Sequence, residues 1–173
     1  DVPRHYTVSG FAHPNLLTFT NEKPYTPQSS IWGIIPPWIK DRKSALSLWN
    51  QTLIARAETM YEKPSFRASA LSNRCLIYVD GFFEYFHSQG TTYPHYIYSP
   101  EDSPLIFGGL WNEWIDPEGG EILHTCSIVT TTANALLKKI HNNPKIAEAR
   151  MPVILNEKNQ DIWLDSSSTR ETI

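Results

Sequence analysis

The stretch Arg74-Cys75-Leu76-Ile77-Tyr78-Val79-Asp80-Gly81-Phe82-Phe83-Glu84-Tyr85 decides the fold of this chain. Residues 75–79 form a run of aliphatic, aromatic and β-branched side chains that has the length of a strand. Asp80-Gly81 interrupts the run and is typical of a turn or a bulge. We therefore predict a strand, a break in it, and a second segment that carries Glu84.

Glu84 is a lone carboxylate whose sequence neighbours are aromatic: Phe82, Phe83, Tyr85 and Phe86. A carboxylate among rings is desolvated, so its pKa is raised and it can act as a general acid or base near neutral pH. The alternative is ordinary strand alternation, in which Glu84 points at water while Phe83 and Tyr85 face the core. The spacing alone leaves both readings open.

Outward from this stretch, short β-rich segments alternate with turns and a few helical segments. Strands are predicted at residues 6–8, 16–20, 31–35, 95–98, 105–111, 122–132 and 150–155. Helices are predicted at 41–50, 64–73 and, most clearly, 133–140. Without repeats or a long linker, the pattern predicts one domain over residues 1–173. Its fold class is α+β, mainly antiparallel sheet with a few peripheral helices.

The composition is that of a globular protein: of 173 residues, 40% are hydrophobic and 19% are charged. No apolar run approaches the roughly 20 residues that span a bilayer, and no signal-peptide pattern opens the chain, so we expect no membrane association. The net charge of -3 gives no overall attraction to nucleic acid. Any such binding would need a local basic patch.

Both cysteines, Cys75 and Cys126, lie in apolar runs and are expected to be buried thiols, which fits a cytoplasmic location. The chain has no metal-ligand spacing such as CxxC or HExxH, and no phosphate-binding or dinucleotide-binding glycine motif. We therefore expect neither a metal nor a cofactor.

Three further residues carry alternatives that the sequence leaves open. His141 follows the predicted helix at 133–140, where a histidine often caps the last carbonyls. Arg56 precedes Glu58 closely enough for a local ion pair, or it could form an anion site. Trp38 follows two prolines and is either a packed ring or an exposed stacking platform for single-stranded nucleic acid.

Several blocks follow one another in a fixed order along the chain: Trp32-Gly33-Ile34-Ile35-Pro36, Ala55-Arg56-Ala57-Glu58-Thr59, Arg74-Cys75-Leu76-Ile77 with Asp80-Gly81-Phe82-Phe83-Glu84, Ile128-Val129-Thr130-Thr131, Ile140-His141-Asn142 and Arg150-Met151-Pro152-Val153-Ile154-Leu155. In this order they resemble the SOS-response-associated peptidase (SRAP) domain. The resemblance covers nearly all of the chain from Trp32 onward.

This resemblance implies a compact, barrel-like β-rich fold with a basic groove for single-stranded DNA. It implies that the protein senses abasic sites and forms a covalent thiazolidine crosslink with them through an N-terminal cysteine. The same cysteine would remove the initiator methionine by autoproteolysis. The expected partner is single-stranded DNA with abasic sites, bound by a monomer in the cytoplasm at the nucleoid.

Carried over by position, the resemblance implies catalytic roles for Glu84 and His141, a pair that could move protons during opening of the sugar hemiacetal. It implies phosphate contacts for Arg56 and a place near the DNA for Arg150. Two more positions complete the expected DNA-binding set, namely an aromatic contact at the lesion and a polar residue of the groove: Trp38 and Thr130.

Several positions depart from the family pattern. The Met-Cys-Gly-Arg opening is absent, so we expect that the chain lacks its N-terminal segment and the nucleophile. Ile54 replaces the usual asparagine and cannot make its hydrogen bonds. Tyr78 replaces a common proline, and Phe86 a frequent basic residue.

Two hypotheses remain: a crosslinking protein without its N-terminal segment, or a catalytically lapsed homologue that only binds single-stranded or damaged DNA. A peptidase acting on other proteins is suggested only by the family name.

Overall fold

In a computed structural model, which describes residues 5–170, the stretch around Asp80-Gly81 forms two strands in different sheets. β4 (Arg74–Val79) lies in the large sheet and β5 (Gly81–Ser88) in a two-stranded one. A Cβ on Gly81 would come within 2.5 Å of the carbonyl oxygen of Ile97 and 2.6 Å of the Tyr96 ring. The break after β4 therefore needs glycine for space, and the chain changes sheet there.

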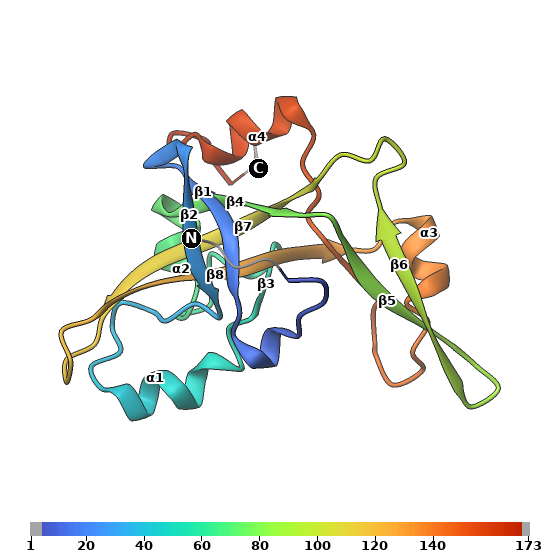
Figure 1. The fold of residues 1–173 in the computed structure, drawn as a ribbon, viewed down its shortest axis with the longest axis horizontal. Helices are drawn as coiled ribbons and strands as arrows, with labels where there is room; N and C mark the ends of the chain where they lie inside the picture. Colours follow the sequence, from blue (N-terminus) through green and yellow to red (C-terminus); the bar gives the residue numbers. More distant parts are fainter. Residues whose placement is uncertain (1–4, 171–173) are drawn as a thin grey trace.

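The large sheet closes into a barrel (Figure 1). Its strands run in the order β2-β1-β4-β7-β8-β3, and β2 also pairs with β8, which closes the ring, while β9 adds to β8. Only the β2–β8 and β3–β8 pairings among the described strands are parallel. The predicted α+β, mainly antiparallel and barrel-like fold is confirmed. The bounds are β1 (Asn15–Thr20), β2 (Lys23–Trp32), β3 (Ile54–Arg56), β7 (Leu105–Ile115), β8 (Ile122–Thr132) and β9 (Arg150–Pro152).

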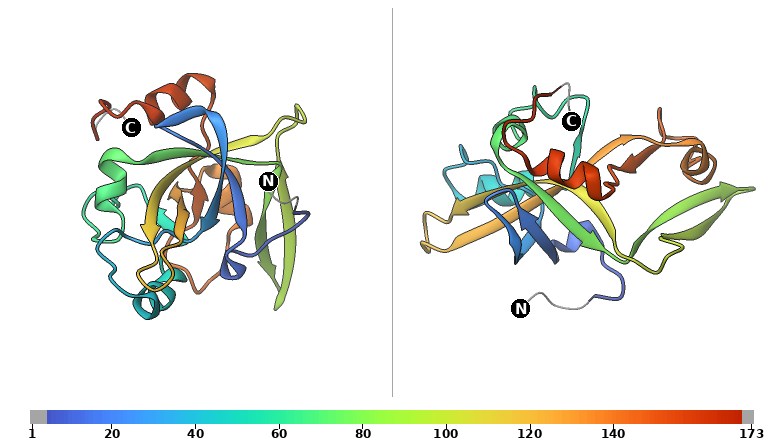
Figure 2. Two further views of the ribbon diagram at one scale, coloured as in Figure 1. Left: turned by 60° about the vertical axis from the view of Figure 1, so that its left-hand side comes forward. Right: turned by 90° about the horizontal axis from the view of Figure 1, so that it is seen from above.

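Short helices surround the barrel. They are α1 (Arg42–Trp49), α2 (Arg67–Ser72), α3 (Ala135–Ile140) and α4 (Glu157–Leu164), with a 3-10 turn η1 at Gly10–Ala12. α1 begins at Asp41, whose side chain accepts a hydrogen bond from the Ser44 N–H at 2.8 Å. α2 and α4 contact β4 and cover that side of the barrel wall (Figures 1 and 2).

Alternation along the barrel strands builds a core on each face of the wall. Under α2 and α4, Trp163 of α4 packs with wall residues such as Leu76 and Leu110. The opposite face forms a second cluster: Leu16, Cys75, Ile77, Phe107, Trp111, Cys126 and Ile128. Burial raises the pKa of the Cys75 thiol well above its usual range and that of Cys126 to about 12, so both thiols are protonated and unreactive.

Three predicted strands needed correction. Tyr6–Val8 is not a strand: Tyr6 is exposed and the segment pairs with no strand of the described chain. The strand predicted at 31–35 ends at Trp32 of β2, after which the Ile34 N–H bonds to the carbonyl of Thr52 instead of a ladder. β9 is likewise shorter than predicted, because beyond Pro152 only Ile154 makes an isolated bridge.

The second sheet is a hairpin of β5 and β6 (Thr91–Tyr98) that projects from the barrel (Figure 1). Its turn residues Gln89 and Gly90 have φ of 48° and 78°, the type I′ geometry that suits a two-residue hairpin. β5 contacts α3 on one side, so this helix joins the hairpin to the barrel. In residues 5–170 no helix has both the length and the apolar character needed to span a bilayer.

Candidate functional site

Glu84 points toward the body of the protein, the reverse of the simple alternation alternative. Its side chain is only 16% exposed, whereas its neighbours Phe83 and Tyr85 are 42% and 50% exposed. The reason is the position of α3, which covers the face of β5 that carries Glu84 and leaves the other face uncovered. The buried-carboxylate reading of this position is the one that the structure shows.

His141 lies at the C-terminal end of α3, where its backbone N–H donates to the Leu137 carbonyl at 2.7 Å. Its ring nitrogen Nδ1 lies 3.1 Å from Oε2 of Glu84 and 3.1 Å from the backbone oxygen of Arg150. Both neighbours are acceptors when Glu84 is ionised, so Nδ1 carries the proton in that state. This leaves Nε2 of the neutral ring as the nitrogen that can accept a proton from another group.

Burial changes the pKa of Glu84 in the Glu84–His141 pair. Burial raises the pKa of the Glu84 carboxyl above its usual range, and the nearby His141 and the backbone N–H of Tyr85 partly offset that rise. A carboxyl and an imidazole in contact, both partly exposed, can exchange protons with a bound molecule near neutral pH. The sequence-predicted pair is therefore brought together in a geometry fit for acid–base work.

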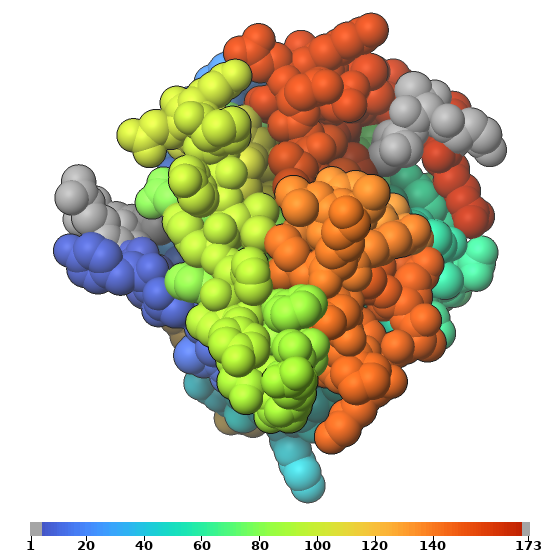
Figure 3. Space-filling model, turned by 90° about the vertical axis from the view of Figure 1, so that its right-hand side faces the viewer, coloured from blue at the N-terminus to red at the C-terminus, as the bar shows by residue number. Residues whose placement is uncertain are grey.

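A pocket of about 280 Å³ opens beside this pair. Its lining comes from β5, β6 and the segment that follows α3: Glu84, Tyr85, His87, Thr92, His141 and Asn143. Figure 3 shows the hairpin lying directly against the segment of α3 and β9. Solvent can therefore reach the Glu84–His141 pair where the β5–β6 hairpin meets the segment of α3 and β9.

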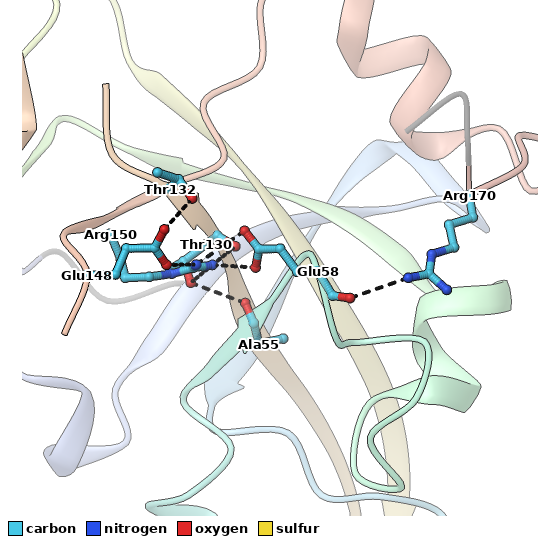
Figure 4. A network of polar contacts seen from close by, with 7 residues as sticks. All are labelled: Ala55, Glu58, Thr130, Thr132, Glu148, Arg150 and Arg170. Atoms are coloured by element: carbon cyan, nitrogen blue, oxygen red, sulfur yellow. Dashed lines mark hydrogen bonds and ion pairs between the residues drawn. The ribbon is translucent and has the colours of Figure 1, made fainter. Parts of the chain in front are cut away.

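Arg150 of β9 lies at the centre of a polar network (Figure 4). Its guanidinium donates to both carboxylate oxygens of Glu58, at 3.2 and 2.7 Å, and to Glu148 at 3.2 Å. It also donates to the Thr130 carbonyl at 2.8 Å. Because its backbone oxygen contacts His141, this network adjoins the Glu84–His141 pair.

The two carboxylates of this network are held ionised. The hydrogen bond from Arg150 lowers the pKa of Glu58, and hydrogen bonds first from Thr132 and then from Arg150 lower that of Glu148. One guanidinium therefore faces two negative charges. A DNA phosphate that bound Arg150 would have to compete with them, and the role of Arg150 at DNA stays a prediction.

The other predicted DNA contacts lie around this network. Thr130 is only 6% exposed, and its hydroxyl donates to the Ala55 carbonyl at 3.4 Å within the wall, so little of it lines a groove. Arg56 is the Cα partner of Thr130 in the β3–β8 ladder and is exposed. Within residues 5–170 no carboxylate lies at ion-pair distance from Arg56, because Glu58 pairs with Arg150 instead.

Ile54, the residue in place of the usual asparagine, begins β3 and is 51% exposed. Trp38 is half exposed, and its Nε1 donates to the Pro64 carbonyl at 3.2 Å. It is thus held by one edge, with part of its ring open to solvent. In the described part of the chain no hydrogen bond or ion pair links Trp38 to Glu84 or His141.

The structure thus joins Glu84, His141, Arg150 and Thr130 in one connected region with β3, whereas the hydrogen bond of Trp38 is to Pro64, outside this network. Sequence reasoning missed Glu148 and the contact between Glu58 and Arg150. No local pattern could have found the latter, because its partners are 92 residues apart. Within residues 5–170 no group of three or more His, Cys, Asp or Glu side chains is placed to hold a metal ion.

Comparison with known proteins gives one family match, to the model described as SOS response associated peptidase (SRAP), over residues 3–173. Among curated relatives, the abasic site processing protein YoqW of Bacillus subtilis is 40% identical over 157 residues, covering 90% of this chain and 65% of YoqW. The abasic site processing protein HMCES of Pongo abelii is 31% identical and is covered over 46% of its length. The chain thus spans less than two thirds of these relatives.

Among solved structures, a protein from Bacteroides thetaiotaomicron matches with a TM-score of 0.86 and 33% identity, covering 95% of this chain and 68% of that one. A protein from Bordetella bronchiseptica matches with a TM-score of 0.80 and 25% identity, over 92% of this chain. Both matches therefore extend over nearly the whole of this chain.

Proposed function

Because the chain belongs to the SOS response associated peptidase (SRAP) family, we propose that it processes abasic sites in DNA. The observation that carries this proposal is the contact between Glu84 and His141. The names of the relatives YoqW and HMCES support the choice of substrate. The proposal includes single-stranded DNA as the bound form, a monomer as the acting unit, and a location in the cytoplasm at the nucleoid.

The proposed reaction is a covalent crosslink between an N-terminal cysteine of the complete protein and the ring-opened sugar. The α-amine adds to the aldehyde carbon, and loss of one water gives a Schiff base. The thiol then adds to the C=N carbon, and its proton passes to nitrogen as the thiazolidine ring closes. Neither Cys75 nor Cys126 can replace this nucleophile, because both are buried and neither carries a free α-amine.

Glu84 and His141 have defined tasks in this scheme. Opening of the sugar hemiacetal moves a proton from the hydroxyl to the ring oxygen, and loss of water needs a proton delivered to the leaving hydroxyl. Nε2 of the neutral His141 ring accepts a proton, while Glu84 stabilises the imidazolium that results, through Nδ1. The raised pKa of Glu84 lets its protonated form serve as the donor.

Arg56 and Trp38 supply the DNA contacts of the proposal. The guanidinium of Arg56 faces solvent without an ion-pair partner in residues 5–170, so it can bind a phosphate without first losing a carboxylate. The half-exposed Trp38 ring offers a face on which a base can stack. Because the net charge of -3 does not attract DNA, the positive charge of Arg56 would supply that attraction locally.

The test mixes the complete protein, with an N-terminal cysteine, with a single-stranded oligonucleotide that carries one abasic site. We expect an adduct that survives a denaturing gel. Glu84→Gln and His141→Ala should slow its formation on the order of 100-fold, while the control His124→Ala, on β8 beside Glu113, should not. Absence of an adduct with the wild-type protein would reject the crosslinking proposal.

Ile54 favours a second candidate function, a binding module without catalysis. An isoleucine at this exposed position cannot orient a sugar oxygen or a cysteine by hydrogen bonds. In that case the protein binds single-stranded DNA without a crosslink, and binding weakens steeply with salt. Arg56→Ala should then reduce affinity at low salt, and unchanged affinity would count against this alternative.

A further inference from the structure

Asn142, the residue after His141, joins the end of α3 to the free edge of β5. Its Oδ1 accepts a hydrogen bond from the His87 backbone N–H at 2.7 Å, and its Nδ2 donates to the His87 backbone oxygen at 2.9 Å. One side-chain amide thus occupies both backbone groups of a single strand residue, as a neighbouring strand would.

The hairpin register explains why these groups are available. The two-residue turn makes Ser88 and Thr91 a hydrogen-bonded pair, so bonded and non-bonded pairs alternate along β5 from there. His87, opposite Thr92, therefore directs its N–H and C=O away from β6, toward α3. Pro94 agrees with this register, because it falls at a non-bonded position where its missing N–H costs nothing.

We propose that Asn142 is a positioning residue that holds β5 and the end of α3 at the separation where Glu84 and His141 meet. The two contacts share their elements: Glu84 and His87 lie on β5, and His141 and Asn142 are consecutive. Nδ1 of His141 also contacts the Arg150 backbone oxygen, which holds the ring independently of β5, so without Asn142 the hairpin is the part that moves. The effect on rate depends on the proposed function, whereas the effect on Glu84 does not.

The test compares Asn142→Ala with the wild-type protein and with Asn156→Ala. Asn156 is a matched control, because its Oδ1 caps α4 through the Asn159 N–H at 3.0 Å, away from the pair. The carboxyl titration of Glu84 is followed by NMR of ¹³C-labelled glutamate, with Glu84→Gln used for assignment. The titratable groups around Glu84 are His141 at the end of α3, His95, its cross-strand partner in β6, and Tyr85 and His87, which line the same pocket.

In Asn142→Ala the hairpin opens and water reaches Glu84, so its pKa falls toward the ordinary glutamate value. The crosslinking rate falls on the order of tenfold or more, because the reacting groups lose their alignment. Asn156→Ala changes neither quantity. A Glu84 titration that stays unchanged in Asn142→Ala overturns the inference, whether or not the protein crosslinks DNA.

If Asn142→Ala does not fold, Asn142→Ser takes its place. The serine hydroxyl is too short to bond both backbone groups of His87, and it adds no charge near Glu84. A fall in the pKa of Glu84 supports the inference, and an unchanged pKa overturns it.

Discussion

Nδ1 of His141 and Oε2 of Glu84 lie 3.1 Å apart, although α3 and β5 belong to different parts of the chain. The contact exists because the hairpin leaves the barrel at Gly81 and returns alongside the end of α3. The same arrangement buries Glu84, so bringing the pair together costs the protein some of its stability whenever the carboxylate is ionised.

We therefore expect Glu84→Gln to be more stable than the wild-type protein at pH 8, but not at pH 4. The pKa of Glu84 is raised in the folded state, so the folded state holds the proton more tightly. Glu84 therefore contributes stability below pH 4.5, its ordinary pKa, and this contribution is lost as the pH rises through the raised pKa of the folded state. Glutamine avoids this loss and keeps an acceptor for the His141 N–H. The expected gain is on the order of 1 kcal/mol.

Urea unfolding at both pH values measures this difference. The exposed Glu101 is the matched control, and Glu101→Gln should differ from wild type in its free energy of unfolding by the same amount at pH 4 and pH 8. Equal stability differences for Glu84→Gln at the two pH values would show that Glu84 is not desolvated in the folded state.

Ile54→Asn should increase the rate of crosslinking by the complete protein. The asparagine would restore hydrogen-bonding groups at the start of β3, and the position is 51% exposed, so the change removes little core contact. Adduct formation under single-turnover conditions measures the effect, for which we expect about tenfold. Leu71→Asn, at an exposed position on α2, is the control. An unchanged rate would mean that the site does not need an amide there.

Trp163→Phe should destabilise the protein by about 1–3 kcal/mol. Trp163 is 3% exposed, and its Nε1 donates to the carbonyl oxygens of Cys75 and Gly109 at 3.0 and 3.3 Å. Phenylalanine leaves these buried acceptors of β4 and β7 without that donor. Thermal unfolding measures the loss, with Trp38→Phe as a control whose ring is half exposed and whose loss should be below about 0.5 kcal/mol. Equal losses would contradict the role given to Trp163.

The strands of the barrel were predictable because their apolar runs are long and bounded by turns, as in residues 122–132 of β8. The orientation of Glu84 was not, since periodicity shows two faces of a strand but not which one another element covers. Here α3 covers the Glu84 face, and the aromatic face of Phe83 and Tyr85 is open. The proximity of Glu84 and His141 was implied by the family resemblance, and its cause, the packing of β5 against α3, is a tertiary feature.

The surroundings of Arg150 were beyond the sequence for a similar reason. The sequence suggests Glu58 as a partner of Arg56, two positions away, but the parallel β3–β8 ladder and the adjacent β9 bring Arg150 to Glu58 instead. Arg56 therefore makes no ion pair within residues 5–170, although its charge still lowers the pKa of Glu58, and a count of nearby charges could not predict this.

Glu148→Gln should tighten binding to single-stranded DNA. Glu148 comes from the segment between α3 and β9 and contacts Arg150 at 3.2 Å, where Glu58 already balances the guanidinium. Neutralising Glu148 removes a charge that repels phosphate and leaves Arg150 paired with one carboxylate. We expect a several-fold gain in affinity at low salt that shrinks as salt screens the charges.

Fluorescence anisotropy with a labelled undamaged oligonucleotide measures this gain in affinity, and Glu22→Gln, in the exposed turn between β1 and β2, is the control. The same gain in both variants would reflect net charge alone, and no gain in either would place the DNA away from Arg150.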